Sequence, residues 1–341
     1  MAFTRWTGSP LSTCIGVEGT GVVGARVARE LASTAATSVV LLSGSQSRRR
    51  DLMSALGPTV VATDDAGAAD LGLDTVVLVT PETTQPDLAD RHLRQGRNVV
   101  ATASSLEAIE RLLELESVAR EVGRHVVVGA CFSPGVSTTL AVHAAALFEE
   151  VLEVRTGFVG WAGEQCELER RAELKRPGRE WRDGAWHEVR PGGLKELLWF
   201  PEPIGARDCG TGALGEALLM HRVLPEAQRV VGRAALPRRT PMRQRIARRG
   251  PMLDDPGAIR VEVRGVRGGV TDSVIYGALE RPSSATAVVA AVAALSIAGT
   301  HAQPRVPSGV VAVPSLGSPV ELLTEWGRRG LRACVFEGSI A

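Results

Sequence analysis

Three glycines near the start of the chain have the spacing that a phosphate-binding turn requires. Gly19, Gly21 and Gly24 form the pattern Gly-x-Gly-x-x-Gly in the stretch GVEGTGVVG, between an apolar run and a helical pattern. The first glycine permits a tight turn, the second lets the backbone approach a pyrophosphate, and the third allows a helix to pack closely on a strand. The N–H groups at the start of that helix then face the phosphates. The pattern predicts a dinucleotide site formed by Gly19, Thr20, Gly21, Val22, Val23 and Gly24.

The end of the next apolar run, SVVLL, indicates which dinucleotide is bound. A domain that prefers NAD usually has Asp or Glu here, to accept hydrogen bonds from the ribose 2′-hydroxyl. This chain instead has Ser43, Ser45 and Arg48, and Arg48 begins a run of three arginines. Hydroxyls and a guanidinium suit a 2′-phosphate, which needs charged, bidentate donors. We therefore predict NADP(H) as the cofactor and NAD as the alternative; the other interpretation of the arginines is a solvated start of a helix.

A parallel sheet is needed to position these residues, and the apolar runs predict one. From residue 13 to about 130, six runs rich in Val, Ile and Leu alternate with helical patterns: TCIGV, TSVVLL, TVVAT, DTVVLVT, NVVATA and HVVVGA. Such continuous apolar strands are typical of a sheet that helices cover on both faces. The predicted fold class is α/β, a Rossmann doubly wound parallel sheet with a second α+β domain that contains antiparallel strands.

The pattern changes after Pro134-Gly135, where a helical stretch leads into a region with many Gly and Pro breaks. That region contains a hairpin predicted around Gly268-Gly269. The alanine-rich residues 284–299 predict a buried helix, and PSGVVAVPSLGSPVELLTEWGRRG predicts a terminal loop and helix. We predict a dinucleotide-binding Rossmann domain over 1–135, an α+β substrate and dimerisation domain over 136–282, and C-terminal helices over 283–341 that pack back on the first domain.

Further strand ends should line the cofactor, because ligands of open α/β sheets bind outside the carboxyl ends of the strands. The residues at those ends are Thr80, Pro81, Ala103, Ser104, Phe132 and Pro134. Each can equally serve only as part of a turn. Since residues 131–136 also begin the second domain, we expect the substrate in the cleft between the domains, with this segment as one wall.

Several side chains are candidates for the chemistry itself. Hydride transfer belongs to the cofactor, so the protein must supply orientation, a proton donor and charge complementarity. The catalytic candidates are His143, on the predicted junction helix, and Lys175 and Lys195, in Gly/Pro-rich surroundings. The alternatives are a satisfied core position for the histidine and a surface position for each lysine. For an acidic substrate, we expect one of Arg170, Arg171, Lys175, Lys195 or Arg207 to face the cleft.

On these motifs the chain resembles the saccharopine dehydrogenase-like family over nearly its full length. Similar features are GVEGTGVVG, the junction GACFSPGVSTTLA, and SSATAVVAAVAALSIAG followed by PSGVVAVPSLGSPVELLTEWGRRGL. The resemblance implies an NAD(P)-dependent reductase or dehydrogenase that acts at a C=N or C=O bond of a small amino-acid-like or amine metabolite. Cys131 and Ser133 stand where the family's junction often has glycine and aspartate, so the resemblance does not assign a substrate. The segment that begins TGFVGWAGEQ resembles the family's second domain only loosely, so no catalytic residue is transferred from it.

Two other functions stay open at this point. The stretch TPETTQPDLADRHLRQGRNVVATAS resembles the sugar or polyol dehydrogenases of the Gfo/Idh/MocA type. However, Ser105-Leu106-Glu107 stands where that family has a lysine in an EKP-type motif. The second alternative is a non-catalytic dinucleotide-sensing protein, because the sequence does not identify a convincing general acid.

Composition limits the class of partner. The 39 Lys and Arg residues nearly balance the 38 Asp and Glu residues, so no net field favours nucleic acid or an anionic membrane. The five cysteines lack a CxxC pair and the six histidines lack ligand spacing, so we expect no metal site and a reducing compartment. The apolar run 285–298 is too short to cross a bilayer. We predict a cytoplasmic protein with a small-molecule substrate, a homodimer through its second domain.

Overall fold

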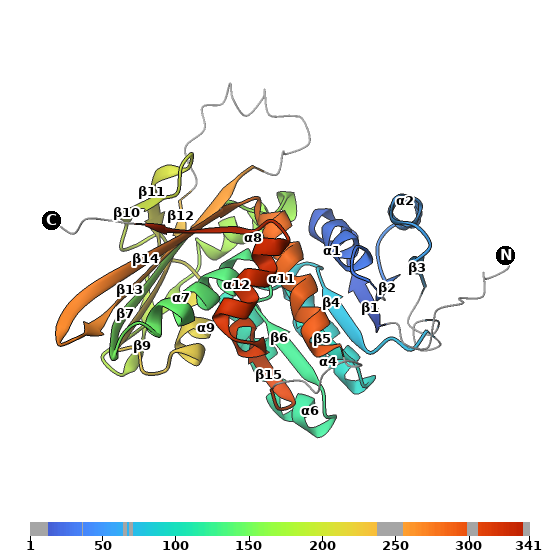
Figure 1. The fold of residues 1–341 in the computed structure, drawn as a ribbon, viewed down its shortest axis with the longest axis horizontal. Coiled ribbons are helices and arrows are strands. Elements are labelled where there is room, and N and C mark those ends of the chain that lie inside the picture. The colour runs from blue at the N-terminus through green and yellow to red at the C-terminus, as the bar shows by residue number, and fades with distance from the viewer. Residues whose placement is uncertain are drawn as a thin grey trace.

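The first part of the chain forms a seven-stranded parallel sheet in the computed structural model (Figure 1). The structure describes residues 13–35, 37–63, 67, 71–236, 255–298 and 306–336. The strand order is β15-β6-β5-β4-β1-β2-β3. The strands are β1 (Thr13–Glu18), β2 (Thr37–Leu41), β3 (Val60–Ala62), β4 (Thr75–Leu78), β5 (Asn98–Ala101), β6 (His125–Val128) and β15 (Gly309–Ala312). All six predicted strands are present, and the predicted Rossmann sheet is confirmed.

Both faces of this sheet are buried, because successive side chains enter two separate hydrophobic cores. Val77 of β4 packs in the core that contains α1 and α11, whereas its neighbour Val76 packs in the core that contains α4 and α5. The helices around the sheet are α1 (Val22–Ala32), α2 (Gln46–Leu56), α4 (Gln85–Arg94), α5 (Leu106–Leu113), α6 (Glu116–Glu121) and α11 (Pro282–Ile297). Among the described residues, no helix combines the length and the apolar character needed to cross a membrane.

A second sheet of mixed strand direction lies beside the first (Figure 1). Its order is β10-β11-β12-β7-β13-β14-β16, and the β8–β9 hairpin pairs with β12. The predicted hairpin is confirmed: β13 and β14 pair antiparallel, and Gly268 and Gly269 turn the chain with φ of 58° and 76°. The strands are β7 (Glu150–Val159), β8 (Gly178–Arg182), β9 (Ala185–Val189), β10 (Glu196–Phe200), β11 (Gly205–Gly210), β12 (Arg229–Ala235), β13 (Gly257–Arg267), β14 (Val270–Glu280) and β16 (Arg332–Phe336).

Among the described residues, the chain passes between the sheets three times. After β6, the turn η2 (Phe132–Val136) leads into α7 (Ser137–Ala145), which packs against β13 and β7. Later α11 returns to pack along α1, β15 joins the first sheet beside β6, and β16 joins the second sheet beside β14. The remaining elements are α8 (Glu164–Glu173), α9 (Glu216–Val223), α12 (Pro319–Arg328) and the short turns η1 (Glu82–Thr84) and η3 (Val313–Leu316).

The C-terminal segment differs from its prediction as a loop and helix. The stretch GVVA forms β15, because its pairing with β6 buries an apolar run that is only four residues long. A run this short between prolines gives no periodicity from which to predict a strand. Since the segment after residue 282 contributes to both sheets, the three-part division of the chain stays a prediction.

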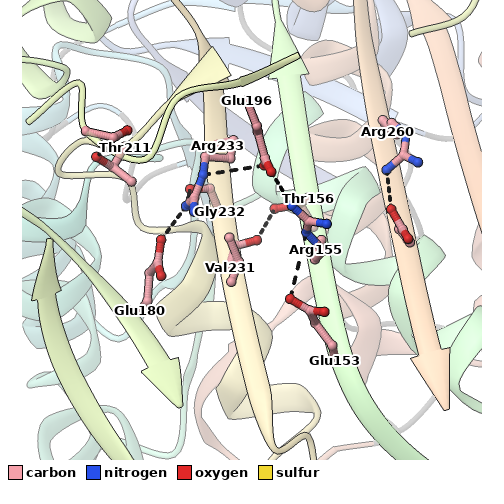
Figure 2. Close-up of polar contacts among 12 residues, drawn as sticks. Glu153, Arg155, Thr156, Glu180, Glu196, Thr211, Val231, Gly232, Arg233 and Arg260 are labelled. Carbon is pink, nitrogen blue, oxygen red and sulfur yellow. Dashed lines mark hydrogen bonds and ion pairs between the residues drawn. The ribbon is translucent and has the colours of Figure 1, made fainter. Parts of the chain in front are cut away.

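Ion pairs link side chains of β7, β12, β8 and β10 in the second sheet, as Figure 2 shows. Arg233 and Glu180 are paired and almost fully buried, with side chains 4% and 1% exposed. Glu196 contacts both Arg233, at 3.5 Å, and Arg155. Leaving one partner of a buried pair without the other costs about 3–5 kcal/mol. This network therefore fixes β8 and β10 on the sheet.

Candidate active site

The glycine-rich turn after β1 has the geometry that the sequence predicts. Gly19 has φ of 116°, and a Cβ on it would lie 2.6 Å from the carbonyl oxygen of Val79. A Cβ on Gly24 would lie 1.8 Å from the carbonyl oxygen of Gly19. No described atom lies within 4 Å of the Cβ position of Gly21. The outer glycines thus hold the turn against β4 and α1, while the middle one leaves an open surface.

The start of α1 fits an anionic group over that surface. Gly21 is the N-cap residue, with no side-chain cap, and the first turn contains no acidic residue among those described. The first N–H groups of a helix have no partner within it and carry a partial positive charge. The loop after β2 lies against the same turn, because a Cβ on Gly44 would lie 1.8 Å from Oγ1 of Thr20.

The residues predicted to select the dinucleotide flank Gly44. Ser45 caps α2, and its hydroxyl accepts a hydrogen bond from the Arg48 N–H at 3.4 Å. The side chains of Ser45 and Arg48 are exposed, and Ser43 is half-buried. The two predicted parts of the site, the glycine-rich turn and the serine and arginine group, are therefore neighbours.

A cleft of about 90 Å³ opens at the carboxyl ends of β4, β5 and β6. Four predicted site residues line it: Val23, Thr80, Ser104 and Phe132. The opposite wall comes from the segment between β7 and α8 and from α8 itself, and the start of α11 completes the cleft. Gly163 in this wall lies close to the start of α1. A Cβ on Gly163 would be 3.7 Å from the side chain of Val22. The cleft thus lies beside the glycine-rich turn.

Three other predicted site residues have structural contacts. The N–H of Ala103 donates to the side chain of Gln85 at 2.9 Å, and Ala103 is fully buried. The carbonyl of Pro134 accepts a hydrogen bond from the Thr138 hydroxyl at 2.7 Å. Pro81 is exposed at the start of η1. Their roles toward a cofactor stay predictions.

Acidic side chains outnumber basic ones among the described residues that line the cleft. Glu82, Glu169 and Glu173 line it together with Arg170, which pairs with Glu173 at 2.7 Å. Glu82 accepts hydrogen bonds from the Ser104 hydroxyl and the Ser105 N–H, both at 2.7 Å. Glu169 accepts a hydrogen bond from the Glu82 N–H at 3.2 Å. The strand ends of the parallel sheet and α8 are thus joined through carboxyl groups.

Two of these carboxyl groups hold protons more tightly than usual. Burial raises the pKa of Glu173 to about 7, against the lowering effect of Arg170, and Glu82 and Glu169 raise it further. Burial also raises the pKa of Glu169, and the nearby Glu82 adds to this. A carboxylic acid with a pKa near neutrality can give or take a proton at physiological pH. Glu173 therefore has the properties of a general acid.

These carboxyl groups are not among the site residues that the sequence predicts. Glu169 and Glu173 are four residues apart, so they lie on one face of α8. That spacing was the available signal, but in the charged stretch ELERRAELKR several faces carry charges and nothing indicates which one turns inward. Of the five basic residues proposed to face the cleft, Arg170 lines it.

The three predicted catalytic residues lie elsewhere among the described residues. His143 on α7 stacks on Tyr276 of β14, with ring centroids 5.6 Å apart. Lys175 is exposed just after α8, and Lys195 is exposed just before β10. None of the three is among the described residues that line the cleft. These positions favour Glu173 over them as the proton donor.

The junction between the sheets is held by a buried carboxyl group. Glu216 of α9 accepts hydrogen bonds from Ser133, at 2.6 Å, and from Ser137. Burial raises the pKa of Glu216, and these hydrogen bonds oppose the increase. Burial also raises the pKa of the Cys131 thiol well above its usual range. The Ser133 hydroxyl therefore fixes the turn, and Cys131 is a packed thiol, not a nucleophile.

Comparisons with known proteins identify the fold. No protein-family model matches the sequence. A search of curated proteins gives no significant match. Among solved structures, saccharopine dehydrogenase (L-Glu forming) from Saccharomyces cerevisiae matches with a TM-score of 0.66 at 14% identity, over 95% of this chain and 100% of that chain.

Two further structures match over similar lengths. DAP dehydrogenase from C. glutamicum, in complex with DAP, has a TM-score of 0.55 at 13% identity, over 92% of this chain and 99% of that chain. An engineered D-amino acid dehydrogenase bound to NADP+ has a TM-score of 0.54 at 14% identity, over 90% and 96% of the two chains. The chain therefore has the fold of the saccharopine dehydrogenase-like NAD(P) oxidoreductases.

Proposed function

We propose that this protein is an NADP-dependent oxidoreductase that reduces a C=N or C=O bond of a small amino-acid-like or amine metabolite, or catalyses the reverse reaction. One observation carries the proposal: the open glycine-rich turn and a proton-holding carboxyl cluster lie beside one cleft, at the carboxyl ends of one parallel sheet. Ligands of such sheets bind at these ends. One structural neighbour is bound to NADP+ and another is in complex with DAP, which supports a nicotinamide dinucleotide and an amino-acid-like substrate as the proposed ligands.

The residues that would hold the dinucleotide fit its chemistry. The backbone at Gly21 and the start of α1 would hold the pyrophosphate, and Ser43, Ser45 and Arg48 would hold the 2′-phosphate. Thr80, Ser104 and Phe132 would lie nearest the reacting end, because they line the cleft. When bound, the nicotinamide supplies or accepts the hydride.

Glu173 would supply the proton that reduction requires. Its carboxyl group gives a proton to the nitrogen or oxygen of the double bond and takes one back in the reverse direction. Arg170 holds this carboxyl group from one side, at 2.7 Å. Phe158 and Trp161 line the same cleft and limit the access of water, which strengthens electrostatic interactions inside it. A proton-holding cluster in the cleft favours an enzyme over a dinucleotide sensor.

The choice of dinucleotide gives a first test. We expect NADPH to bind at least tenfold more tightly than NADH, because only NADPH offers a 2′-phosphate to Arg48. Fluorescence titration with both nucleotides measures this. Arg48→Gln should weaken NADPH binding about tenfold and leave NADH unchanged, whereas Arg50→Gln, an exposed neighbour bonded to the Gln46 carbonyl, should change neither. Tighter or equal binding of NADH contradicts the NADP assignment, and binding of neither nucleotide contradicts the proposed function.

We also infer a homodimer through the second sheet. Leu197 and Trp199 of β10 are 58% and 62% exposed, and Leu194 beside them is 55% exposed. Large apolar side chains gathered on one surface indicate a contact with another protein, and the second copy is the partner we propose. Trp199→Glu should convert the dimer into a monomer in sedimentation experiments, whereas Val320→Glu, at an equally exposed position on α12, should not. A monomeric wild-type protein contradicts the inference.

We place the protein in the cytoplasm. Cys14, Cys131, Cys166 and Cys209 are free thiols in the structure. Free thiols, three of them buried and that of Cys166 half-buried, fit a reducing compartment, where disulfides are rare. Burial raises the pKa of Cys14 to about 11 and that of Cys166 to about 12, which makes these thiols slow to react.

A further inference from the structure

We propose that the substrate presents a protonated amine to the cleft, and that the part of the substrate bound there carries no carboxylate. This inference rests on the proposed function and specifies its substrate class. It also replaces the expectation that a basic residue in the cleft would bind an acidic substrate. Two features of the cleft carry it: the partners of Arg170, and the excess of carboxyl groups among the described residues that line it.

Arg170 is already held on several sides by the protein. Its guanidinium pairs with Glu173 at 2.7 Å and donates to the Ser104 hydroxyl at 3.1 Å. It also lies over the ring of Phe158, 4.3 Å from the ring centroid. A substrate carboxylate needs two parallel N–H donors of one guanidinium for strong binding. Glu173, which is only 4% exposed, and Ser104 already occupy one donor on each terminal nitrogen of Arg170, so the charge of this guanidinium is compensated by the protein.

The other four basic candidates lie outside the lining of the cleft, unlike Arg170. Arg171 pairs with Glu167 and is about half exposed, and Arg207 donates to the Ala206 carbonyl at 2.7 Å. Lys175 and Lys195 are exposed. None of these four is among the described residues that line the cleft. A substrate carboxylate in the cleft would therefore meet Glu82, Glu169 and Glu173 without a matching cation.

An ammonium group suits this arrangement. Three carboxyl groups line the cleft against one guanidinium, so the local field favours a cation. An ammonium group has three N–H donors and no acceptor, and can bond to two carboxylates at once. Trp161 adds an aromatic ring to the same lining, which favours both a cation and the methylene groups attached to it. Each of these features is unfavourable for a dianion.

A bound ammonium group should also change the protonation of the cluster, because burial raises the pKa values of Glu173 and Glu169. Burial raises the pKa of Glu173 most, and Glu82 and Glu169 raise it further. Arg170 and Arg176 lower it. A cation near this cluster lowers the pKa of its carboxyl groups. With NADP+ bound, where Glu173 takes up a proton as the base, binding of the amine near pH 7 should therefore release protons to the buffer.

A matched set of four-carbon ligands tests the charge preference. The set is 1,4-diaminobutane, butylamine, 4-aminobutyrate and succinate, titrated by calorimetry into the protein with saturating NADP+. We expect 1,4-diaminobutane to bind at least tenfold more tightly than 4-aminobutyrate, with proton release measured in two buffers of different ionisation enthalpy. Succinate should give no measurable binding. Succinate or 4-aminobutyrate binding as tightly as the diamine, or no binding of the diamine at millimolar concentration, overturns the proposal.

Two variants test whether the diamine binds beside Glu169 in the cleft. Glu169→Gln should weaken diamine binding at least tenfold while NADPH binding stays unchanged, because the amide keeps an acceptor for the Glu82 N–H and loses the charge. Glu188→Gln, an exposed position on β9, should leave diamine binding unchanged. An equal effect of the two variants overturns the assignment to the cleft. Failure of NADPH to bind the wild-type protein would instead contradict the proposed function itself.

Discussion

Glu173→Gln is expected to lower kcat/KM for NADPH-linked reduction by about 10²- to 10⁴-fold, the usual contribution of a general acid. The amide has nearly the shape of the carboxyl group but cannot give up a proton. For the wild-type protein, kcat/KM of reduction should fall as pH rises through about 7, because Glu173 loses its proton there. The Gln variant should lack that decrease. An unchanged pH profile in the variant would show that another group donates the proton.

The same carboxyl group should affect stability in a way that needs no substrate. The pKa of Glu173 is raised from 4.5 to about 7 on folding, so between these values the folded protein binds more protons than the unfolded chain. The unfolding free energy therefore falls as pH rises through this window, by at most about 1.4 kcal/mol per pH unit for one proton. The contribution is fully present below pH 4.5 and lost above pH 7.

Denaturant unfolding at pH 5 and pH 8 measures this effect. The stability difference between the two pH values should be smaller in Glu173→Gln than in the wild-type protein. Glu188→Gln serves as the control, because this residue is exposed on β9 and should keep the wild-type difference. The same pH dependence in all three proteins would mean that Glu173 titrates near its ordinary value.

The parallel sheet could be predicted because its strands are short and wholly apolar. Val99 and Val100 of β5 are both fully buried although their side chains point to opposite faces, and only a sheet covered on both sides allows this. The glycine-rich turn could be predicted for a similar local reason, since its requirements concern backbone conformation and close approach. The strand β15 could not, because its stability comes from pairing with β6, almost 200 residues earlier in the sequence.

The carboxyl cluster could not be predicted because it depends on tertiary packing. Glu82 and Glu169 are 87 residues apart and meet only when α8 covers the end of β4. In the sequence alone, a glutamate on a charged helix that faces a cleft cannot be distinguished from one that faces water. His143 on the predicted junction helix and the two lysines in Gly/Pro-rich surroundings are candidates by residue type and position, and neither property indicates burial. Burial by the surrounding fold is what gives Glu173 its altered pKa.

Gly21→Val should reduce NADPH affinity by about 100-fold or more without unfolding the protein. The Cβ position of Gly21 has no described atom within 4 Å, and its φ of −71° is accessible to any residue. The new side chain therefore meets no protein atom near its Cβ, but it occupies the surface where the pyrophosphate must approach the backbone. Because Gly21 is the N-cap of α1, we expect a stability cost of about 1 kcal/mol.

The control is Gly327→Val on α12, where the Cβ position is also open. It should leave NADPH affinity unchanged and should not destabilise the protein, because valine has a slightly higher helix propensity than glycine; denaturant unfolding and fluorescence titration measure both. Gly24→Ala is a less selective test, because its Cβ would lie 1.8 Å from the Gly19 carbonyl oxygen and should destabilise the turn itself by about 1–3 kcal/mol. If folded Gly21→Val protein keeps wild-type affinity for NADPH, the dinucleotide does not bind at this turn.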